Sequence, residues 1–337
     1  MSGRVYLDWN ATAPLRPEAR AAMIAAFDTV GNPSSVHAEG RAARAIVERA
    51  REAVAAALGC KATEVVFTSG ATEAAGVLAG FDAVTVEPTA HECLRAHARG
   101  TGGVYALGLA NSETGILSAM PETAGPVLLD VAQAVGRVPF AFGWSGATFA
   151  IVSAHKLGGP KGVGALIVRD GVEIASLRPG GGQEKGRRSG TETVAAIAGF
   201  GAAVTAAMRD LAEGVWTRVA ALRDGLEARL ADAAEGTIFV GKDSARLPNT
   251  SCILTPGWKG ETQVMQMDLA GFAVSAGAAC SSGKVTASPV LRAMGYDARA
   301  AGSAIRVSIG PTTTQDDLDR FAAAWLAARA RQRARAA

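Results

Sequence analysis

Short apolar runs alternate with helical stretches between residues 65 and 168, and this alternation constrains the fold more than any other feature of the chain. Apolar runs of strand length that are separated by helices predict a mostly parallel sheet covered on both faces. The chain is therefore expected to be an α/β protein. The predicted strands are residues 65–68, 83–86, 127–129, 148–152 and 163–168.

The pattern of predicted helices and strands changes after Gly190. An alanine-rich helical region runs from about residue 193 to 234, and strand candidates with intervening helices follow at 237–240, 250–254, 272–275 and 305–309. This order predicts a smaller α+β domain. We expect a large domain of residues 15–212 and a small domain of residues 1–14 plus 213–337.

Composition excludes several classes of protein. The chain has 337 residues, of which 49% are hydrophobic, and this length is typical of about two domains. A net charge of +3 is too small to indicate direct binding of nucleic acid. The arginines near the end of the chain form the solvated end of a helix or meet an anionic partner. They are Arg329, Arg331, Arg333 and Arg335.

The start of the sequence lacks the apolar core of a signal peptide, and we find no run of 18 or more apolar residues. We therefore expect a cytoplasmic protein without a membrane partner. The four cysteines lack paired metal-ligand spacing and the four histidines are scattered, so no metal site is predicted. In this compartment the thiols are expected to be reduced.

Lys156 follows an apolar run and precedes a glycine-rich stretch. It is either a surface lysine at a strand end or an amine that desolvation turns into a nucleophile. Enzymes that use pyridoxal phosphate (PLP) need such a lysine to hold the cofactor as a Schiff base. Asp130 also ends an apolar run. It either caps the next helix or faces a cation such as the protonated pyridine nitrogen of PLP.

Two glycine-containing segments are candidate phosphate sites. Ser69-Gly70-Ala71-Thr72 lies at a strand-to-helix turn, where backbone N–H groups bind phosphate, although a helix cap is the simpler interpretation. The loop of residues 180–190 is either a second phosphate-binding segment or a solvated loop.

Two residues of the second domain are candidates for reaction and binding. Cys280 lies among alanine, serine and glycine, which favours an accessible thiol over an inert core cysteine. Arg306 lies in an apolar strand and either grips an anion such as a substrate carboxylate or forms an internal salt bridge.

Taken together, these segments resemble the cysteine desulfurases, a branch of the class V aminotransferase group of fold type I PLP enzymes. The likeness runs in order along nearly the whole chain. Its segments are Tyr6-Leu7-Asp8, Asn32-Pro33-Ser34-Ser35 with His37, Ser69-Gly70-Ala71-Thr72-Glu73, Asn111 with Glu113-Thr114-Gly115, Asp130-Val131-Ala132-Gln133-Ala134-Val135-Gly136, Ser153-Ala154-His155-Lys156, Gly181-Gly182-Gln183-Glu184 with Arg188-Ser189-Gly190-Thr191, the Cys280 loop, and Ile305-Arg306-Val307-Ser308-Ile309-Gly310.

The resemblance implies a fold type I PLP-dependent transferase with a seven-stranded type of sheet in the large domain. It implies that Lys156 holds PLP and transfers protons, and that Asp130 pairs with the pyridine nitrogen. It also implies that His91 stacks on the ring, Gln133 bonds the ring hydroxyl and Asn111 lies near that hydroxyl or the substrate. The phosphate would be held by Ala71, Thr72, Ser153 and His155, and by Thr191 from the neighbouring subunit of a homodimer.

The implied reaction converts L-cysteine to L-alanine and leaves a persulfide on Cys280, with Arg306 binding the substrate carboxylate. The segment after Cys280 resembles the long-loop group, which supplies iron–sulfur scaffold proteins or tRNA thiolation. The stretch between Glu73 and Asn111 is shorter than is usual in the family. A selenocysteine lyase, a cystine-cleaving lyase, and a degenerate scaffold that needs a partner remain as alternatives.

Overall fold

The computed structural model describes residues 3–277 and 287–336, and the chain divides into two compact units. The large unit comprises Thr12–Ala110 and Ser118–Glu213, and the small unit comprises Met1–Ala11, Asn111–Leu117 and Gly214–Ala337. The sequence prediction had placed residues 111–117 in the large domain. Backbone hydrogen bonds explain the difference, because Leu117 N–H donates to Ala245 O (2.9 Å) and Leu247 N–H donates to Gly115 O (2.7 Å).

The large unit contains a sheet of six strands in the order β2-β7-β6-β5-β4-β3. The seven-stranded expectation is therefore wrong for the described residues, because the short stretch between Glu73 and Asn111 supplies only two strands. The other strand predictions in this unit are confirmed, whereas β4 was not among the predicted strands. The strands are β2 (Val65–Thr68), β3 (Val84–Val86), β4 (Val104–Gly108), β5 (Val127–Asp130), β6 (Phe149–Ser153) and β7 (Gly164–Val168).

Strand direction brings several chain segments to one edge of this sheet. β3, β4, β5 and β6 are parallel, and β2 runs in the same direction because β7 is antiparallel to both β2 and β6. The connection from β6 to β7 is short and rich in glycine, so it lacks the crossover helix that a parallel return requires. The carboxyl ends of β2 to β6 therefore share one edge, which is where active groups gather in such sheets.

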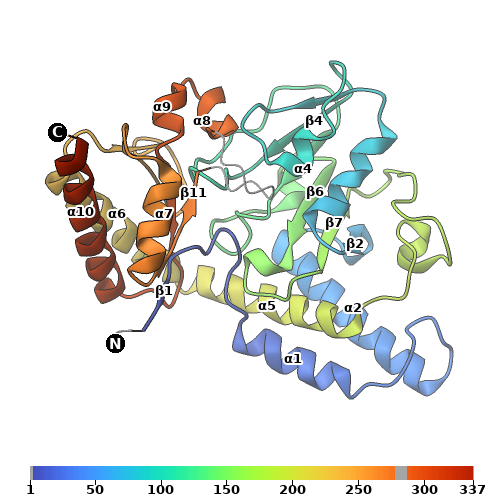
Figure 1. Ribbon diagram of the computed structural model, residues 1–337. Helices are drawn as coiled ribbons and strands as arrows, with labels where there is room; N and C mark the ends of the chain where they lie inside the picture. Colours follow the sequence, from blue (N-terminus) through green and yellow to red (C-terminus); the bar gives the residue numbers. More distant parts are fainter. Residues whose placement is uncertain (1–2, 278–286, 337) are drawn as a thin grey trace. The chain divides into compact units, whose positions relative to one another are not determined.

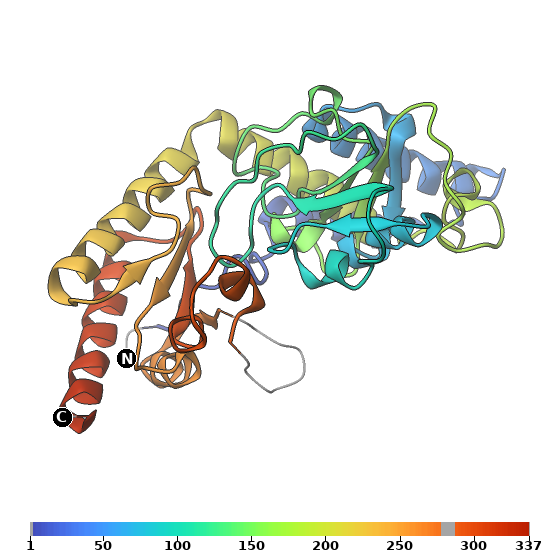
Figure 2. The same ribbon diagram turned by 90° about the horizontal axis from the view of Figure 1, so that it is seen from above.

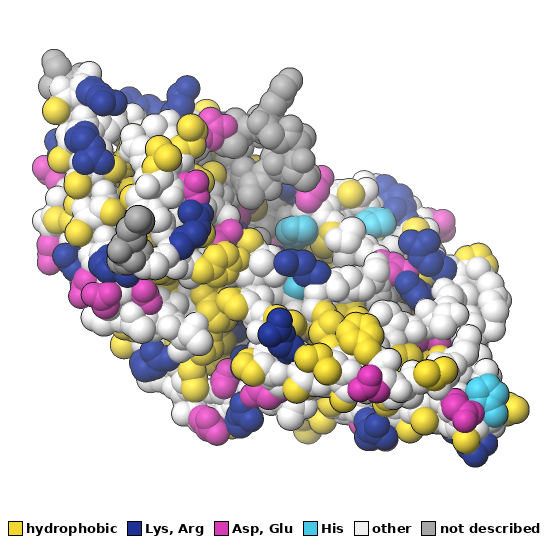
Figure 3. All heavy atoms as spheres, turned by 60° about the horizontal axis from the view of Figure 1, so that its bottom comes forward, with side chains coloured by type: hydrophobic (Ala, Val, Ile, Leu, Met, Phe, Trp, Pro, Cys, Tyr) yellow, Lys and Arg dark blue, Asp and Glu magenta, His cyan; other side chains and the backbone are white. Residues whose placement is uncertain are grey.

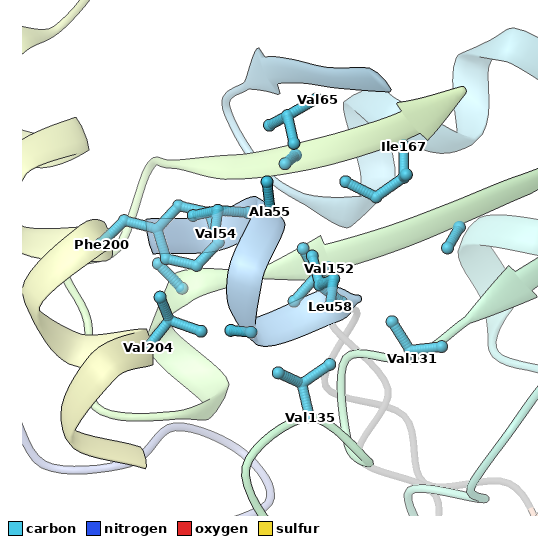
Figure 4. Close-up of a cluster of buried hydrophobic side chains, with 14 of the residues drawn as sticks. Val54, Ala55, Leu58, Val65, Val131, Val135, Val152, Ile167, Phe200 and Val204 are labelled. Carbon is cyan, nitrogen blue, oxygen red and sulfur yellow. The ribbon is translucent and has the colours of Figure 1, made fainter. Parts of the chain in front are cut away.

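Helices cover both faces of the sheet, and alternate strand residues point into the two cores. Val65 and Phe67 join a cluster with residues of α2 and α5, whereas Val66 joins the cluster on the opposite face. Figure 1 shows α5 and α2 along one side of the sheet, and Figure 4 shows their side chains packed against strand residues. The helices of this unit are α1 (Pro17–Phe27), α2 (Ala38–Leu58), α3 (Ala71–Ala74), α4 (Glu92–Arg95) and α5 (Val194–Ala212), with 3-10 helices η1 (Ala62–Glu64), η2 (Ala75–Gly80), η3 (Phe142–Trp144), η4 (Ala154–Lys156) and η5 (Gln183–Gly186).

Helix α5 is long and apolar enough to cross a membrane by length and composition. One such helix is weak evidence for a membrane span, since a core helix has the same character. Its residues Ile197, Phe200 and Val204 are buried in the cluster that also contains residues of α2. We therefore interpret α5 as a core helix of the large unit.

The small unit has a four-stranded antiparallel sheet in the order β11-β12-β9-β8 and a parallel pair of β1 with β10. Helices α6 and α10 lie side by side in this unit (Figure 2). The expected helical region of residues 193–234 is two helices, because Gly214 adopts a φ of 72° between them. The elements are β1 (Val5–Tyr6), α6 (Val215–Ala233), β8 (Ile238–Phe239), β9 (Thr250–Leu254), α7 (Gly260–Leu269), β10 (Phe272–Ala273), β11 (Ser275–Ala276), α8 (Pro289–Ala293), α9 (Ala298–Ala301), β12 (Ala304–Ser308) and α10 (Gln315–Ala336).

Candidate active site

The turn after β2 is built by close contact between backbones and one serine. Ala71 N–H donates to Ser153 Oγ (2.9 Å), which ties this turn to the end of β6. A Cβ on Gly164 would lie 2.7 Å from Gly70 Cα, so only glycine allows β7 to approach the turn this closely. The turn also contains Thr72, which is exposed. The predicted phosphate residues Ala71 and Ser153 are thus neighbours.

Glu73 fixes the same turn from its other side, and sequence reasoning gave it no role. Its carboxylate accepts the Ser69 N–H (2.6 Å), Arg178 Nε (2.8 Å) and Arg188 Nε (3.0 Å). Although burial opposes it, hydrogen bonds from Arg188, Ser69 and Arg178 lower the pKa of Glu73 to about 2. Glu73 therefore links the turn to the segment that leads to Thr191, an exposed residue.

Asp130 stands at the end of β5 as a carboxyl group surrounded by protein. Its Oδ1 accepts the Ala132 N–H (2.9 Å), which is a cap of the following turn. Burial raises the pKa of Asp130, while the Ala132 hydrogen bond and the charges of His91 and Lys156 oppose that increase. A cation placed beside this carboxyl would stabilise its ionised form.

His91 is the N-cap residue of the short helix α4 and is exposed. Its Nδ1 accepts the Cys93 N–H (3.2 Å), so the ring proton resides on Nε2. Surrounding protein lowers the pKa of His91 more than the nearby Asp130 carboxyl raises it, and Lys156 lowers it further. The neutral ring suits a stacking role, because a charged imidazolium would repel the cationic pyridine nitrogen that Asp130 fits.

Lys156 ends η4 directly after β6, and its residue is half-buried. Neighbouring carbonyl groups hold this segment in place: His155 O accepts the Ala13 N–H (2.8 Å), and Leu157 O accepts Arg16 Nε (2.9 Å). The His155 ring lies 3.2 Å from Thr12 Oγ1. Burial, with the charges of Lys156 and Lys161, lowers the pKa of His155 to about 4.

These groups fit PLP. A desolvated carboxyl, a lysine and a neutral histidine act electrostatically on one another at one edge of the sheet. The Ser69–Ala71 turn, which ends β2, lies at the same edge. Lys156 would hold the cofactor, Asp130 would face its ring nitrogen and His91 its ring. Within residues 3–277 and 287–336, no group of three or more His, Cys, Asp or Glu is placed to hold a metal ion.

Of the other predicted residues, Gln133 belongs to the large unit, whereas Asn111 and Arg306 belong to the small unit. Asn111 Oδ1 accepts the N–H groups of Glu113 and Thr114 (both 2.9 Å) and so shapes its own turn. Arg306 forms the internal salt bridge that was its alternative interpretation, with Nη2 2.7 Å from Asp8 Oδ1. Its Nη1 donates to Ser112 O (3.1 Å). Cys280 lies outside the described residues.

Comparison with known proteins identifies the family. Residues 5–89 and 95–321 match the model for class-V aminotransferases. The chain belongs to the class-V aminotransferase family. It is a PLP-dependent enzyme of the cysteine desulfurase type, with the fold type I architecture. The match leaves out residues 90–94 and so does not include His91.

Proteins similar in sequence to this chain include cysteine desulfurases. A cysteine desulfurase of Cereibacter sphaeroides is 38% identical, with 94% of each chain covered. An IscS-like cysteine desulfurase of Mycobacterium tuberculosis is 36% identical, with 93% of each chain covered. The solved structure of a NifS-like protein from Rickettsia africae has a TM-score of 0.87 and 29% identity, and the match covers 96% of this chain and 98% of that one.

Proposed function

We propose that this enzyme converts L-cysteine to L-alanine and takes the sulfur onto Cys280 as a persulfide. The observation that carries the proposal is the grouping of Lys156, Asp130 and His91 at the carboxyl edge of the sheet. Bound PLP supplies a ring that accepts the electrons left at the substrate Cα when its proton is removed. Lys156 Nζ would remove and return protons there.

The other residues bind and orient. The Asp130 carboxylate would hold the ring nitrogen in its protonated state, and Ser153 and the Ala71 turn would fix the phosphate. Arg306 would bind the substrate carboxylate, which requires it to exchange or share its contact with Asp8. In the sulfur transfer, the Cys280 thiolate forms an S–S bond to the substrate sulfur while the C–S bond breaks. The carbon keeps that electron pair and gains a proton, which gives alanine.

Incubation with L-cysteine tests this proposal directly. We expect alanine in solution and a mass increase of one sulfur atom on the peptide that contains Cys280. Lys156→Ala should lose both, together with the visible absorption of bound PLP. Cys280→Ala should keep PLP but lose alanine formation from cysteine, whereas the control Cys60→Ala should retain it. A Cys280→Ala enzyme with full activity on cysteine would contradict the sulfur-transfer proposal.

A selenocysteine lyase would give a different pattern. Such an enzyme releases its product directly and needs no travelling thiol, so Cys280→Ala should retain activity on selenocysteine. A cystine-cleaving lyase should likewise act without Cys280. PLP binding with no alanine and no persulfide would instead support a degenerate scaffold.

We further propose a homodimer in the cytoplasm in which Thr191 reaches the phosphate of the neighbouring subunit. Thr191 is exposed, and the large unit also exposes Phe27, Val30 and Val36, whose exposed fractions are 70%, 80% and 84%. Figure 3 shows hydrophobic side chains exposed among charged ones. A subunit interface that included these residues would cover their apolar side chains. Free thiol chemistry fits a reducing compartment.

Sedimentation of the holoenzyme tests the dimer. We expect a dimer for the wild type and a weaker one for Phe27→Glu, because a carboxylate would be buried at the interface. Thr191→Ala should keep the dimer and lose PLP affinity. A monomeric wild type would contradict the shared site.

The sulfur acceptor that we propose is an iron–sulfur scaffold protein, and a sulfur carrier for tRNA thiolation is the second candidate.

A further inference from the structure

A buried arginine connects two of the site residues. The Arg137 side chain is almost completely inaccessible, with the residue 4% exposed. Its Nη1 donates to Gln133 Oε1 (2.7 Å) and its Nη2 donates to the backbone oxygen of Lys156 (2.8 Å). One planar guanidinium therefore spans the turn after β5 and the lysine segment after β6.

The local sequence explains how Arg137 reaches this position. Val131 O accepts the Ala134 and Val135 N–H groups, and Ala134 O accepts the Arg137 N–H, so residues 131–137 form consecutive turns. Gly136 has a φ of 72°, and a Cβ on it would lie 2.6 Å from Ala207 Cβ. Only glycine allows this bend, which directs the chain toward Arg137.

The contact with Arg137 fixes the orientation of the Gln133 amide. A guanidinium has only N–H donors, so the amide atom that faces it is the carbonyl oxygen. The Nε2 donors of Gln133 consequently point away from Arg137. The positive charge also polarises the amide, which makes those N–H groups stronger donors.

We propose that Arg137 is a positioning residue that orients Gln133 so that its Nε2 donates to the ring oxygen of the cofactor, and that anchors Lys156 beside it. This inference rests on the proposed function, in which Gln133 bonds the ring hydroxyl. A donor to that oxygen withdraws negative charge from it. The oxygen then attracts the proton on the neighbouring Lys156 Nζ less strongly, and loss of the donor raises the pH at which this proton leaves.

The pH midpoint of the visible absorption band of the holoenzyme measures this effect without turnover. We expect Arg137→Met to raise the midpoint by about 0.5 to 1 pH unit, in the same direction as Gln133→Met. The variant that combines Arg137→Met with Gln133→Met should shift the midpoint no further than Gln133→Met alone, because both substitutions remove the same donor to the ring oxygen. Arg137→Lys should lie between wild type and Arg137→Met, since a single ammonium cannot replace both contacts of the fork.

Arg16→Met is the matched control. Arg16 also binds the lysine segment, through Leu157 O (2.9 Å), and pairs with Asp210 (2.6 Å), but it lacks the contact with Gln133. Its loss should loosen that segment and leave the midpoint unchanged. The titratable groups that interact with Lys156 from neighbouring segments, His91, Asp130 and His155, stay the same in every variant.

The outcomes separate this inference from the proposed function. If Gln133→Met shifts the midpoint and Arg137→Lys and Arg137→Met do not, Arg137 does not orient the amide. An equal shift in Arg16→Met would reduce Arg137 to a structural anchor and overturn the inference. Should Arg137→Met not fold, the comparison of Arg137→Lys with Arg16→Met decides. A wild-type protein that binds no PLP at Lys156 would instead defeat the proposed function.

Discussion

Individual residues at the sheet edge show how burial sets protonation. Surrounding protein raises the pKa of the Asp130 carboxyl and lowers the pKa of His91 and His155. Desolvation thus favours the neutral form of each group in the same small region. A cationic ring nitrogen beside Asp130 would reverse this preference, which would couple ionisation of Asp130 to cofactor binding.

The depressed pKa of His155 predicts a loss of stability in acid. The folded-state pKa of about 4 lies below the unfolded value of about 6.5, so the unfolded chain binds more protons between these values. The free energy of unfolding should therefore decrease as the pH falls from about 6.5 to about 4. Solvent screening of the half-buried ring limits the change to on the order of 1 kcal/mol.

Urea unfolding of wild type and His155→Asn between pH 7 and pH 4 measures the contribution of His155 to the pH dependence of stability. Asparagine is chosen because it keeps a polar atom near Thr12. We expect the wild type to lose stability more steeply than the variant as the pH falls. Parallel curves for the two proteins would show that His155 titrates alike in the folded and unfolded chains.

At the scale of elements, two small residues set how closely the turn after β2 approaches the sheet. Gly164 starts β7, and a Cβ there would lie 2.4 Å from Val152 O and 2.7 Å from Gly70 Cα. Ser153 completes the contact by accepting the Ala71 N–H. The turn that we propose to bind the phosphate is therefore positioned by the packing of β6, β7 and β2 as much as by its own sequence.

Gly164→Ala should separate these elements. We expect a loss of about 1–3 kcal/mol in stability and weaker PLP binding, since the neighbouring atoms are backbone and cannot rotate away. Gly225→Ala is the matched control: it lies inside α6, where an added Cβ meets nothing within 4 Å. That change should raise stability by about 0.5–1 kcal/mol. Equal effects of the two substitutions in thermal unfolding would refute the packing argument.

At the scale of the whole molecule, the described cysteines of both units are shielded. Burial raises the pKa of Cys60 to about 12 and raises those of Cys93 and Cys252 as well. A thiol reacts through its thiolate, so these three should be slow to react in the folded enzyme. Their low reactivity is consistent with the proposal that Cys280 carries the sulfur chemistry.

Limited alkylation with iodoacetamide at pH 8 tests this difference across the chain. We expect the native enzyme to be modified first at Cys280, and Cys280→Ala to remain unmodified until urea exposes the other thiols. Rapid native labelling of Cys60 in the variant would contradict the effect of burial on its thiol.

The sequence alone was sufficient for the fold class, the family and most strands, because these depend on local apolar patterns and on motifs that are continuous in the chain. Residues at strand ends, such as Asp130 and Lys156, were recognisable for the same reason. Glu73 and Arg137 gave only weak signals, a glutamate in the first turn of a helix and an arginine four residues after Gln133. Their partners come from segments that the sequence does not show to be close.

Tertiary structure decided what depends on contacts between distant segments. It reduced the large sheet to six strands, assigned residues 111–117 to the small unit and paired Arg306 with Asp8. It also fixed the orientation of the Gln133 amide, whose oxygen accepts a hydrogen bond from Arg137. Apolar periodicity fixes which face of an element is buried, whereas the partner of a polar group is chosen only when the folded chain brings one donor to one acceptor.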